Sequence, residues 1–303
     1  MGVSEKLLFA FWGMTENKDN KRIQSQTPPD GISVISDLSY INDGKREHLL
    51  DVYYPQNTLE KLPVIIDIHG GGWMYGYKEI NKYYCMHLAA LGFTVFSINY
   101  TLAPKANYKQ QVRECFDAFR WIAENGEKYP CDMNNVFLTG DSAGGHLAAL
   151  CCEIFGRSDL PTVFNVQLPS FNIRAVGFTC GAFSMPVLLS KINVPLARTY
   201  ARFILGPDMR DPQRKYHADA VHLLEGAKMP PVYLSSSKQD FIGFETKKFC
   251  KRMDELQIPY KLRFWDKGKD HVLEHVFNIL QPSYSDSIIT NTEMTDFFKS
   301  NII

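Results

Sequence analysis

At residues 136–150 the chain reads Val-Phe-Leu-Thr-Gly-Asp-Ser-Ala-Gly-Gly-His-Leu-Ala-Ala-Leu. The apolar run Val136–Leu138 is typical of a buried strand, and the run His146–Leu150 is typical of the start of a helix. Between them lies Gly140–Gly144, a G-x-S-x-G pattern. In this context the pattern predicts a sharp strand-to-helix turn that holds Ser142 in a strained backbone conformation with its hydroxyl exposed.

The glycines and the helix of this turn each have a physical purpose. A Cβ at Gly140 or Gly144 would collide with the neighbouring strand or helix. The helix directs its N-terminal N–H groups at the serine, where negative charge would develop. Because glycine and serine are common, the bare pattern arises by chance in about one chain in ten of this length. How strongly the pattern indicates a nucleophilic serine therefore depends on the rest of the sequence.

A second glycine-rich loop precedes the serine. The continuous apolar run Pro63–Ile68 is typical of a central parallel strand, and it leads straight into His69-Gly-Gly-Gly-Trp73. Consecutive glycines let backbone N–H groups turn toward a bound oxyanion without obstruction by side chains. A flexible turn is the alternative interpretation. The pairing with Ser142 favours an oxyanion hole formed by this loop and the N–H that follows the nucleophile.

Strand and helix patterns alternate along most of the chain. We expect strands at Leu49–Tyr54, Pro63–Ile68, Phe93–Ile98, Val136–Leu138, Ile173–Thr179, Pro231–Ser236 and Tyr260–Trp265. We expect helices at Glu79–Leu91, Tyr108–Asn125, Glu245–Leu256 and Ser285–Lys299. Asn42–Lys45 has the chemistry of a hairpin turn before the first of these strands. The alternation predicts an α/β fold, with a mostly parallel central sheet and helices on both faces.

Two segments depart from this alternation. Residues 1–36 contain one apolar run, Leu7–Met14, which predicts a short helix followed by a polar connector. Residues 181–229 contain short helical patterns separated by prolines, and we interpret them as an inserted lid. We therefore expect a single domain over residues 1–303, with an N-terminal lid or peripheral segment. Six lid side chains could line an acyl pocket or form the core of the lid: Phe183, Met185, Leu188, Leu189, Tyr200 and Phe203.

Composition excludes several classes of protein. The 303 residues include 33 basic and 33 acidic side chains, so the formal net charge is zero, which argues against a nucleic-acid partner. No apolar run reaches 18 residues, and Leu7–Met14 lacks the cleavage site of a signal peptide. We therefore expect no membrane insertion and a cytoplasmic location.

The seven cysteines form neither a disulfide framework nor a metal motif. Their number is odd, and no C-x-x-C spacing occurs. We interpret them as reduced, small core side chains. The glycine-rich loop also lacks the Lys-Ser/Thr of a phosphate-binding loop. We expect no metal and no cofactor.

Taken with these motifs, the chain from about Asp51 to the C-terminus resembles the hormone-sensitive-lipase-like and acetyl esterase branch of the α/β-hydrolase family. The motifs that carry the resemblance are His69–Trp73, Asn99–Pro104, Gly140–Gly145, Asp240 and Glu274–Phe277. The second of them departs from the commoner Asp-Tyr-Arg-Leu-Ala-Pro form, with asparagine and threonine in place of the acid and the base. That departure concerns a structural ion pair and not the chemistry.

The resemblance implies that Ser142 is the nucleophile and that Gly71, Gly72 and Ala143 supply the N–H groups of an oxyanion hole. The chemistry is consistent, because a serine hydroxyl is a poor nucleophile until an adjacent imidazole removes its proton. Preorganised donors then hold the tetrahedral oxyanion, each contributing on the order of 3–4 kcal/mol to lowering the barrier.

The acid of a triad with this chain order lies between Ser142 and the last histidines. Asp240 follows a strand that ends in Ser235–Ser237, where an acid loop is expected. The other candidates, Asp211, Asp219 and Asp254, lie in the presumed lid or on a helix. We expect Asp240 to be the acid. Its alternative interpretation is a helix N-cap or loop residue.

The base is one of two histidines that follow the last strand. His275-Val-Phe resembles the family's His-x-Phe signature, whereas spacing from Asp240 favours the nearer His271. We choose His275 and keep His271 as the alternative. His69 is expected to shape the glycine loop, and His146 is expected to be structural.

These features predict a serine carboxylesterase that cleaves small, short-chain acyl esters by two-step acyl transfer. An acetyl-xylan or feruloyl esterase, or an arylformamidase, would use the same machinery. A binding protein on a hydrolase scaffold is the alternative from another class. The expected partner is a small-molecule ester, and an edge strand or the lid could mediate a homodimer.

Overall fold

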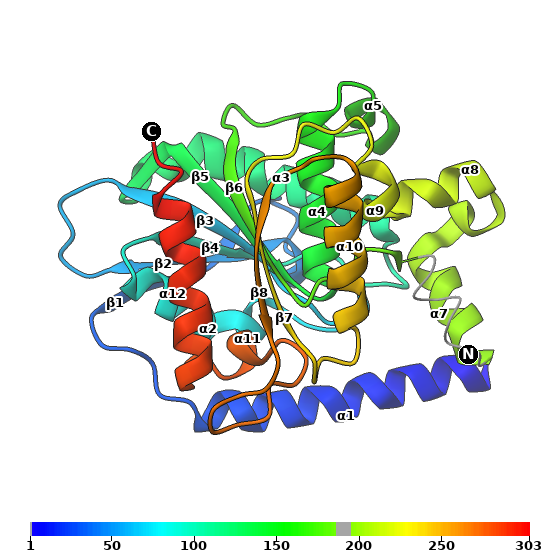
Figure 1. The fold of residues 1–303 in the computed structure, drawn as a ribbon, viewed down its shortest axis with the longest axis horizontal. Coiled ribbons are helices and arrows are strands. Elements are labelled where there is room, and N and C mark those ends of the chain that lie inside the picture. Colours follow the sequence, from blue (N-terminus) through cyan, green and yellow to red (C-terminus); the bar gives the residue numbers. More distant parts are fainter. Residues whose placement is uncertain (1, 186–194) are drawn as a thin grey trace.

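An eight-stranded sheet runs through the centre of the molecule (Figure 1). The computed structural model describes residues 2–185 and 195–303. The strands are β1 (Ile32–Ser39), β2 (Leu49–Pro55), β3 (Leu62–Ile68), β4 (Thr94–Ile98), β5 (Cys131–Asp141), β6 (Ile173–Thr179), β7 (Val232–Ser237) and β8 (Tyr260–Trp265). Their order is β1-β2-β4-β3-β5-β6-β7-β8, and only the β1–β2 and β2–β4 pairs are antiparallel. The predicted mostly parallel α/β sheet is confirmed.

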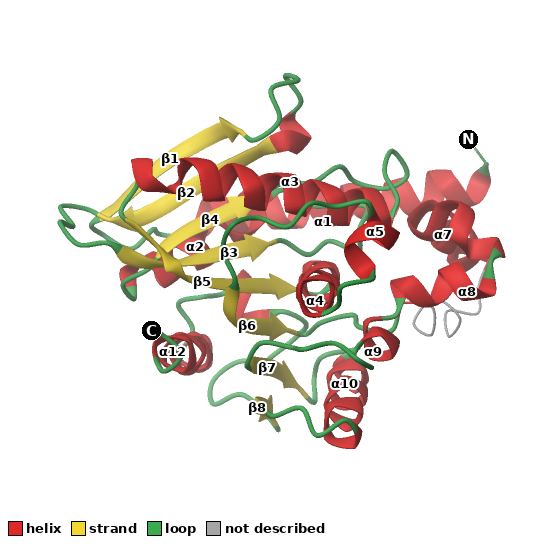
Figure 2. Cartoon of the chain, turned by 90° about the horizontal axis from the view of Figure 1, so that it is seen from above, coloured by secondary structure: helices red, strands yellow, loops and turns green. Residues whose placement is uncertain are grey.

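Helices cover both faces of the sheet. One face carries α2 (Lys82–Ala90), α11 (Phe277–Leu280) and α12 (Ser285–Lys299). The other carries α3 (Tyr108–Asn125), α4 (Ala143–Gly156) and α10 (Gly243–Glu255), with α5 (Leu160–Phe164) packed on α4. Figure 2 shows α12 on one side of the strands and α4 and α10 on the other. Short 3₁₀ turns lie at η1 (Arg46–His48), η2 (Lys78–Asn81) and η3 (Gly126–Lys128).

The central strand β3 explains why its sequence is continuously apolar. Val64, Ile66 and Ile68 pack in the core beneath α3 and α4, whereas Ile65 packs in the core beneath α2. All four side chains are fully buried. Because successive side chains of a strand point to opposite faces, a strand covered on both faces needs apolar residues throughout.

Several predicted boundaries were wrong by a few residues. The predicted helix Glu79–Leu91 is divided into η2 and α2 at Asn81, whose side chain points inward to two carboxylates. β5 is longer at both ends than the apolar run Val136–Leu138 that predicted it. By contrast, α3, β6, β8 and α12 have the predicted bounds.

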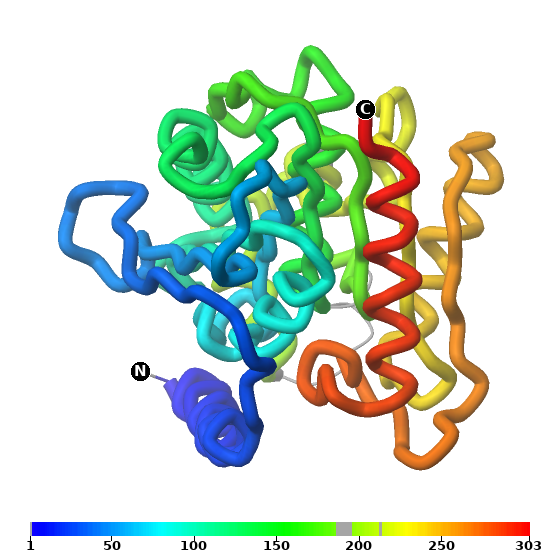
Figure 3. Tube along the Cα trace, turned by 90° about the vertical axis from the view of Figure 1, so that its left-hand side faces the viewer, coloured from blue at the N-terminus to red at the C-terminus, as the bar shows by residue number. Residues whose placement is uncertain are grey.

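The N-terminal segment differs most from expectation. A single 23-residue helix, α1 (Val3–Ser25), replaces the predicted short helix and connector. No proline interrupts the segment before Pro28, and Arg22 ties its second half to the body by donating to the carbonyls of Leu280 (3.0 Å) and Ile80 (3.3 Å). Figure 1 shows α1 lying along one edge of the molecule, and Figure 3 shows it nearly end-on.

A helical insert separates β6 from β7. Its described elements are α7 (Pro195–Leu205), η4 (Gly206–Arg210), α8 (Pro212–Lys215), η5 (Tyr216–Ala218) and α9 (Ala220–Leu223). Helix α7 packs against α1 (Figure 1). Phe183 and Met185 are fully buried, and Phe183 stacks on Phe249 at 4.0 Å between ring centroids. These two side chains therefore belong to the core and not to an acyl pocket; Leu188 and Leu189 lie outside the described residues.

Asn99, which stands where the commoner family motif has an acid, holds its loop by hydrogen bonds. Its side chain accepts from the backbone N–H of Lys78 (2.6 Å) and donates to the carbonyl of Arg46 (2.9 Å). Thr101 takes part through its backbone N–H, which donates to Glu114 (2.6 Å). The loop is thus held without an ion pair between its own residues.

Candidate active site

The turn after β5 has the predicted strained geometry. Ser142 adopts φ 51° and ψ −116°, a region that side chains rarely occupy. Gly144 is required because a Cβ there would lie 2.0 Å from the carbonyl oxygen of Ile68. The turn therefore presses the start of α4 against the end of β3.

Ser142, His275 and Asp240 meet at the carboxyl edge of the sheet, after β5, β8 and β7. The Oγ of Ser142 lies 2.9 Å from Nε2 of His275, and Nδ1 of His275 lies 2.7 Å from Oδ1 of Asp240. Such a chain can move a proton from the hydroxyl to the imidazole while the carboxylate orients the ring.

Three donors surround the Asp240 carboxylate. Besides His275, the backbone N–H of Ile242 donates to Oδ1 (3.0 Å), and the hydroxyl of Ser236 donates to Oδ2 (2.9 Å). Burial alone would raise the pKa of Asp240, but these hydrogen bonds and the nearby imidazole outweigh it and lower that pKa below its usual value. Asp240 is therefore a carboxylate at neutral pH.

The competing candidates lie elsewhere. His271 is exposed and stacks on Tyr284, with 3.7 Å between ring centroids. Asp219 caps α9 by accepting from the N–H groups of Val221 and His222. Asp254 accepts from the hydroxyl of Tyr260 on the surface.

Hydrogen bonds to two carbonyls of the glycine loop after β3 fix the orientation of its peptides. His69 donates from Nδ1 to the Gly70 carbonyl (2.7 Å), and the N–H of Tyr75 donates to the Gly71 carbonyl (2.9 Å). Because a peptide's N–H points away from its C=O, these bonds orient the N–H groups of Gly71 and Gly72. In the described part of the chain, neither of these two N–H groups has a hydrogen-bond partner.

Asp141 joins the serine turn to the glycine loop. Its Oδ1 accepts from the N–H of Gly70 (3.0 Å) and from Nδ2 of Asn81 (2.9 Å). Asn81 also donates to Asp67 Oδ2 (3.1 Å), so one amide bridges two buried carboxyl groups. Neither Asn81 nor Asp67 was among the predicted site residues. The available signal was a single acid inside the apolar strand β3.

The two carboxyl groups have raised pKa values. Burial, and then the neighbouring charge of Asp141, raise the pKa of Asp67 to about 7. Burial raises the pKa of Asp141 to about 6. Ionisation of Asp67 thus occurs close to neutral pH.

Asp67 should make the stability of the protein fall as pH rises. Since its folded pKa lies above the unfolded value of about 3.9, its contribution to stability is lost between about pH 4 and about pH 7. Asp67→Asn removes the buried charge, so the variant should not share this loss of stability. We expect the difference in free energy of unfolding, variant minus wild type, to be about 1–3 kcal/mol larger at pH 8 than at pH 5. Urea denaturation at both pH values measures this. The exposed Asp254→Asn is the control, and an equal Asp67→Asn effect at both pH values would contradict the prediction.

His146 links the glycine loop to the insert. It accepts from Nε1 of Trp73 at Nδ1 (3.2 Å) and donates from Nε2 to the carbonyl of Ala218 (3.0 Å). Burial lowers the pKa of His146 to about 4, so the ring is neutral, as this pair of bonds requires. Both nitrogens are occupied, which confirms a structural role.

All seven cysteines are free and buried, as expected. Cys180 also lies beside the candidate site. Its Sγ accepts from the N–H of Val276 (3.4 Å), and the ligand atoms of Cys180, Asp240 and His275 lie within 4.8 Å of one another. These donor types can hold zinc. Here, however, the carboxylate and the imidazole are already hydrogen-bonded to each other.

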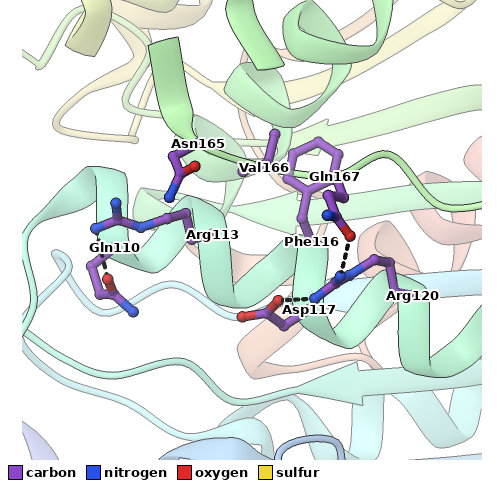
Figure 4. A pocket seen from close by; sticks show the side chains of 8 residues that line it. All are labelled: Gln110, Arg113, Phe116, Asp117, Arg120, Asn165, Val166 and Gln167. Carbon is purple, nitrogen blue, oxygen red and sulfur yellow. Dashed lines mark hydrogen bonds and ion pairs between the residues drawn. The ribbon is translucent and has the colours of Figure 1, made fainter. Parts of the chain in front are cut away.

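A separate surface hollow of about 550 Å³ lies between α3 and the segment after α5 (Figure 4). It is lined by Gln110, Arg113, Phe116, Asp117, Arg120, Asn165, Val166 and Gln167. Arg120 is already bonded to Asp117 and Gln167. None of the lining residues belongs to the candidate site. In the described residues, no helix is both long and apolar enough to cross a membrane.

Comparisons with known proteins place the chain among the hydrolases. Residues 50–242 match the BD-FAE family model. Over 274 residues the chain is 23% identical to the putative alpha/beta hydrolase R526 of Acanthamoeba polyphaga mimivirus, covering 80% of this chain and 74% of that protein. Over 166 residues it is 30% identical to carboxylesterase NlhH of Mycobacterium tuberculosis, covering 50% of this chain and about half (52%) of that relative.

The similarity extends to a solved structure along nearly its whole length. Inhibited esterase B from Lactobacillus rhamnosis superposes with a TM-score of 0.94 at 28% identity, covering 99% of this chain and 96% of that one. The family match spans more than half of the chain, and the similar proteins named here are hydrolases, two of them esterases. The chain therefore belongs to the BD-FAE family and is a carboxylic ester hydrolase with the α/β-hydrolase fold.

Proposed function

We propose that the protein is a serine carboxylesterase acting on small esters with short acyl chains, and that Ser142, His275 and Asp240 are its catalytic triad. The observation that carries the proposal is the unbroken hydrogen-bonded chain from Ser142 Oγ through His275 to a buried carboxylate. Three residues that lie far apart in sequence have no packing reason to meet in this order.

The proposed reaction has two steps of acyl transfer. His275 Nε2 takes the proton as Ser142 Oγ attacks the ester carbonyl, and the oxyanion is held by the N–H groups of Gly71, Gly72 and Ala143. The imidazolium returns the proton to the departing alcohol, which leaves an acyl-enzyme. Water, activated by the same imidazole, releases the acid.

The preference for short acyl chains is supported by two rings beside the glycine loop. A Cβ placed on Gly72 would lie 2.2 Å from the hydroxyl of Tyr200 and 2.6 Å from Cζ2 of Trp12. These side chains come from α7 and α1. We therefore propose that α1 and the helical insert form the lid of a single domain, and that their bulk limits the room for substrate.

A fluorophosphonate should label one residue of the wild-type protein, Ser142. Phosphonylation needs an activated serine, so mass spectrometry should show a single adduct that is absent from Ser142→Ala. Ser285→Ala, which changes an exposed serine, should keep the adduct. A wild-type protein that neither takes up the reagent at Ser142 nor hydrolyses p-nitrophenyl acetate would favour the binding-protein alternative.

A further inference from the structure

The three glycine carbonyls of the loop are anchored by different parts of the chain. Gly70 and Gly71 are held locally, by His69 and by the N–H groups of the next turn. The Gly72 carbonyl accepts instead from the hydroxyl of Tyr200 at 2.5 Å. Tyr200 belongs to α7, in the insert, and is separated from Gly72 by 128 positions in the sequence.

The Gly72–Trp73 peptide needs an anchor of this kind. Gly72 has φ 56° and Trp73 has φ 61°, and the second value is rare for a residue with a side chain. The local backbone preference therefore does not favour the observed orientation of this peptide. A hydrogen bond from outside the loop fixes the peptide that directly follows the Gly72 N–H.

Helices α1 and α7 reach the loop together. Trp12 of α1 lies against Gly72 and stacks on Tyr75, with 5.5 Å between ring centroids. The hydroxyl of Tyr75 donates to Asp19 of α1 (2.9 Å). Arg202 of α7 forms an ion pair with Glu5 of α1 (2.9 Å). The two helices also pack against each other (Figure 1). The two helices thus form one body seated on the loop.

We propose that Tyr200 is a positioning residue for catalysis, whose hydroxyl holds the Gly72–Trp73 peptide and thereby completes the oxyanion hole when α7 is seated. The proposal rests on the proposed function, because Gly72 must supply a donor. Without the hydroxyl, the Gly72–Trp73 peptide can rotate about the Cα–C bond of Gly72, so the backbone at Gly72 is no longer fixed on both sides of its N–H. The loss of this hydrogen bond therefore destabilises the transition state and not the bound substrate.

Tyr200→Phe should therefore lower kcat for p-nitrophenyl acetate by about 10- to 100-fold, while KM stays within about twofold. A trifluoromethyl ketone forms a hemiketal oxyanion with the serine, so its Ki should rise by about the same factor. This second measurement separates positioning from folding. A variant that merely unfolds in part loses kcat, but its remaining active molecules keep the wild-type Ki.

Tyr108→Phe is the matched control. Its hydroxyl donates to Asp208 (2.8 Å) and so ties α3 to η4 of the same insert, without contact to the glycine loop. We expect this variant to keep kcat and Ki. An unchanged Ki in Tyr200→Phe, or equal losses in Tyr108→Phe, would overturn the proposal. Hydrolysis that persists in Ser142→Ala would instead refute the proposed function, so the two failures are distinguishable.

Discussion

His275→Ala should lower kcat/KM for p-nitrophenyl acetate by about 10⁴-fold or more, whereas His271→Ala should stay within about threefold of wild type. We propose that His275 takes the proton from Ser142, because its Nε2 lies 2.9 Å from Oγ. His271 is exposed and stacked on Tyr284, away from the serine. Steady-state kinetics on the three proteins, with circular dichroism to confirm folding, measure the difference.

The His275→Ala and His271→Ala variants control for each other. Both histidines follow β8 and lie four residues apart, so a general disturbance of this loop should affect both variants. A large loss in His271→Ala with an active His275→Ala would assign the base to the other residue. Comparable losses in both would show that the loop, and not one imidazole, limits the rate.

Asp240→Asn should lower kcat by about 10⁴-fold with little change in fold. The carboxylate accepts from His275 Nδ1 at 2.7 Å, which leaves Nε2 unprotonated and able to receive the serine proton. An amide at this position can donate to Nδ1 and so stabilise the wrong tautomer. Since hydrogen bonds and the nearby imidazole lower the pKa of Asp240 despite its burial, the wild-type carboxylate keeps its charge at neutral pH.

Asp254→Asn on α10 provides the control, because that exposed carboxylate accepts from the hydroxyl of Tyr260 and not from a residue of the candidate site. The measurement is kcat for both variants across pH, together with thermal denaturation. An Asp240→Asn enzyme with kcat within tenfold of wild type would contradict the assignment of Asp240 as the orienting acid.

Local sequence patterns predicted much of the fold. The continuous apolar run at Pro63–Ile68 predicted a central strand because both faces of β3 are buried. The helical period of Tyr108–Asn125 predicted α3 with its observed bounds. The length of α1 was missed because its second half is polar and is held by contacts with η2 and the end of α11, which no local pattern reports.

For the candidate site, local sequence predicted where the chain turns and which residues are candidates for its chemistry. The glycines at 140 and 144 and the loop at 70–72 are readable because only glycine fits those backbone positions. Three features are visible only in the tertiary structure: the position of His275 beside Ser142, the bridge from Asp67 through Asn81 to Asp141, and the contact of Tyr200 with Gly72. Each depends on side chains from distant segments reaching the same edge of the sheet, and distance in space is not encoded in local periodicity.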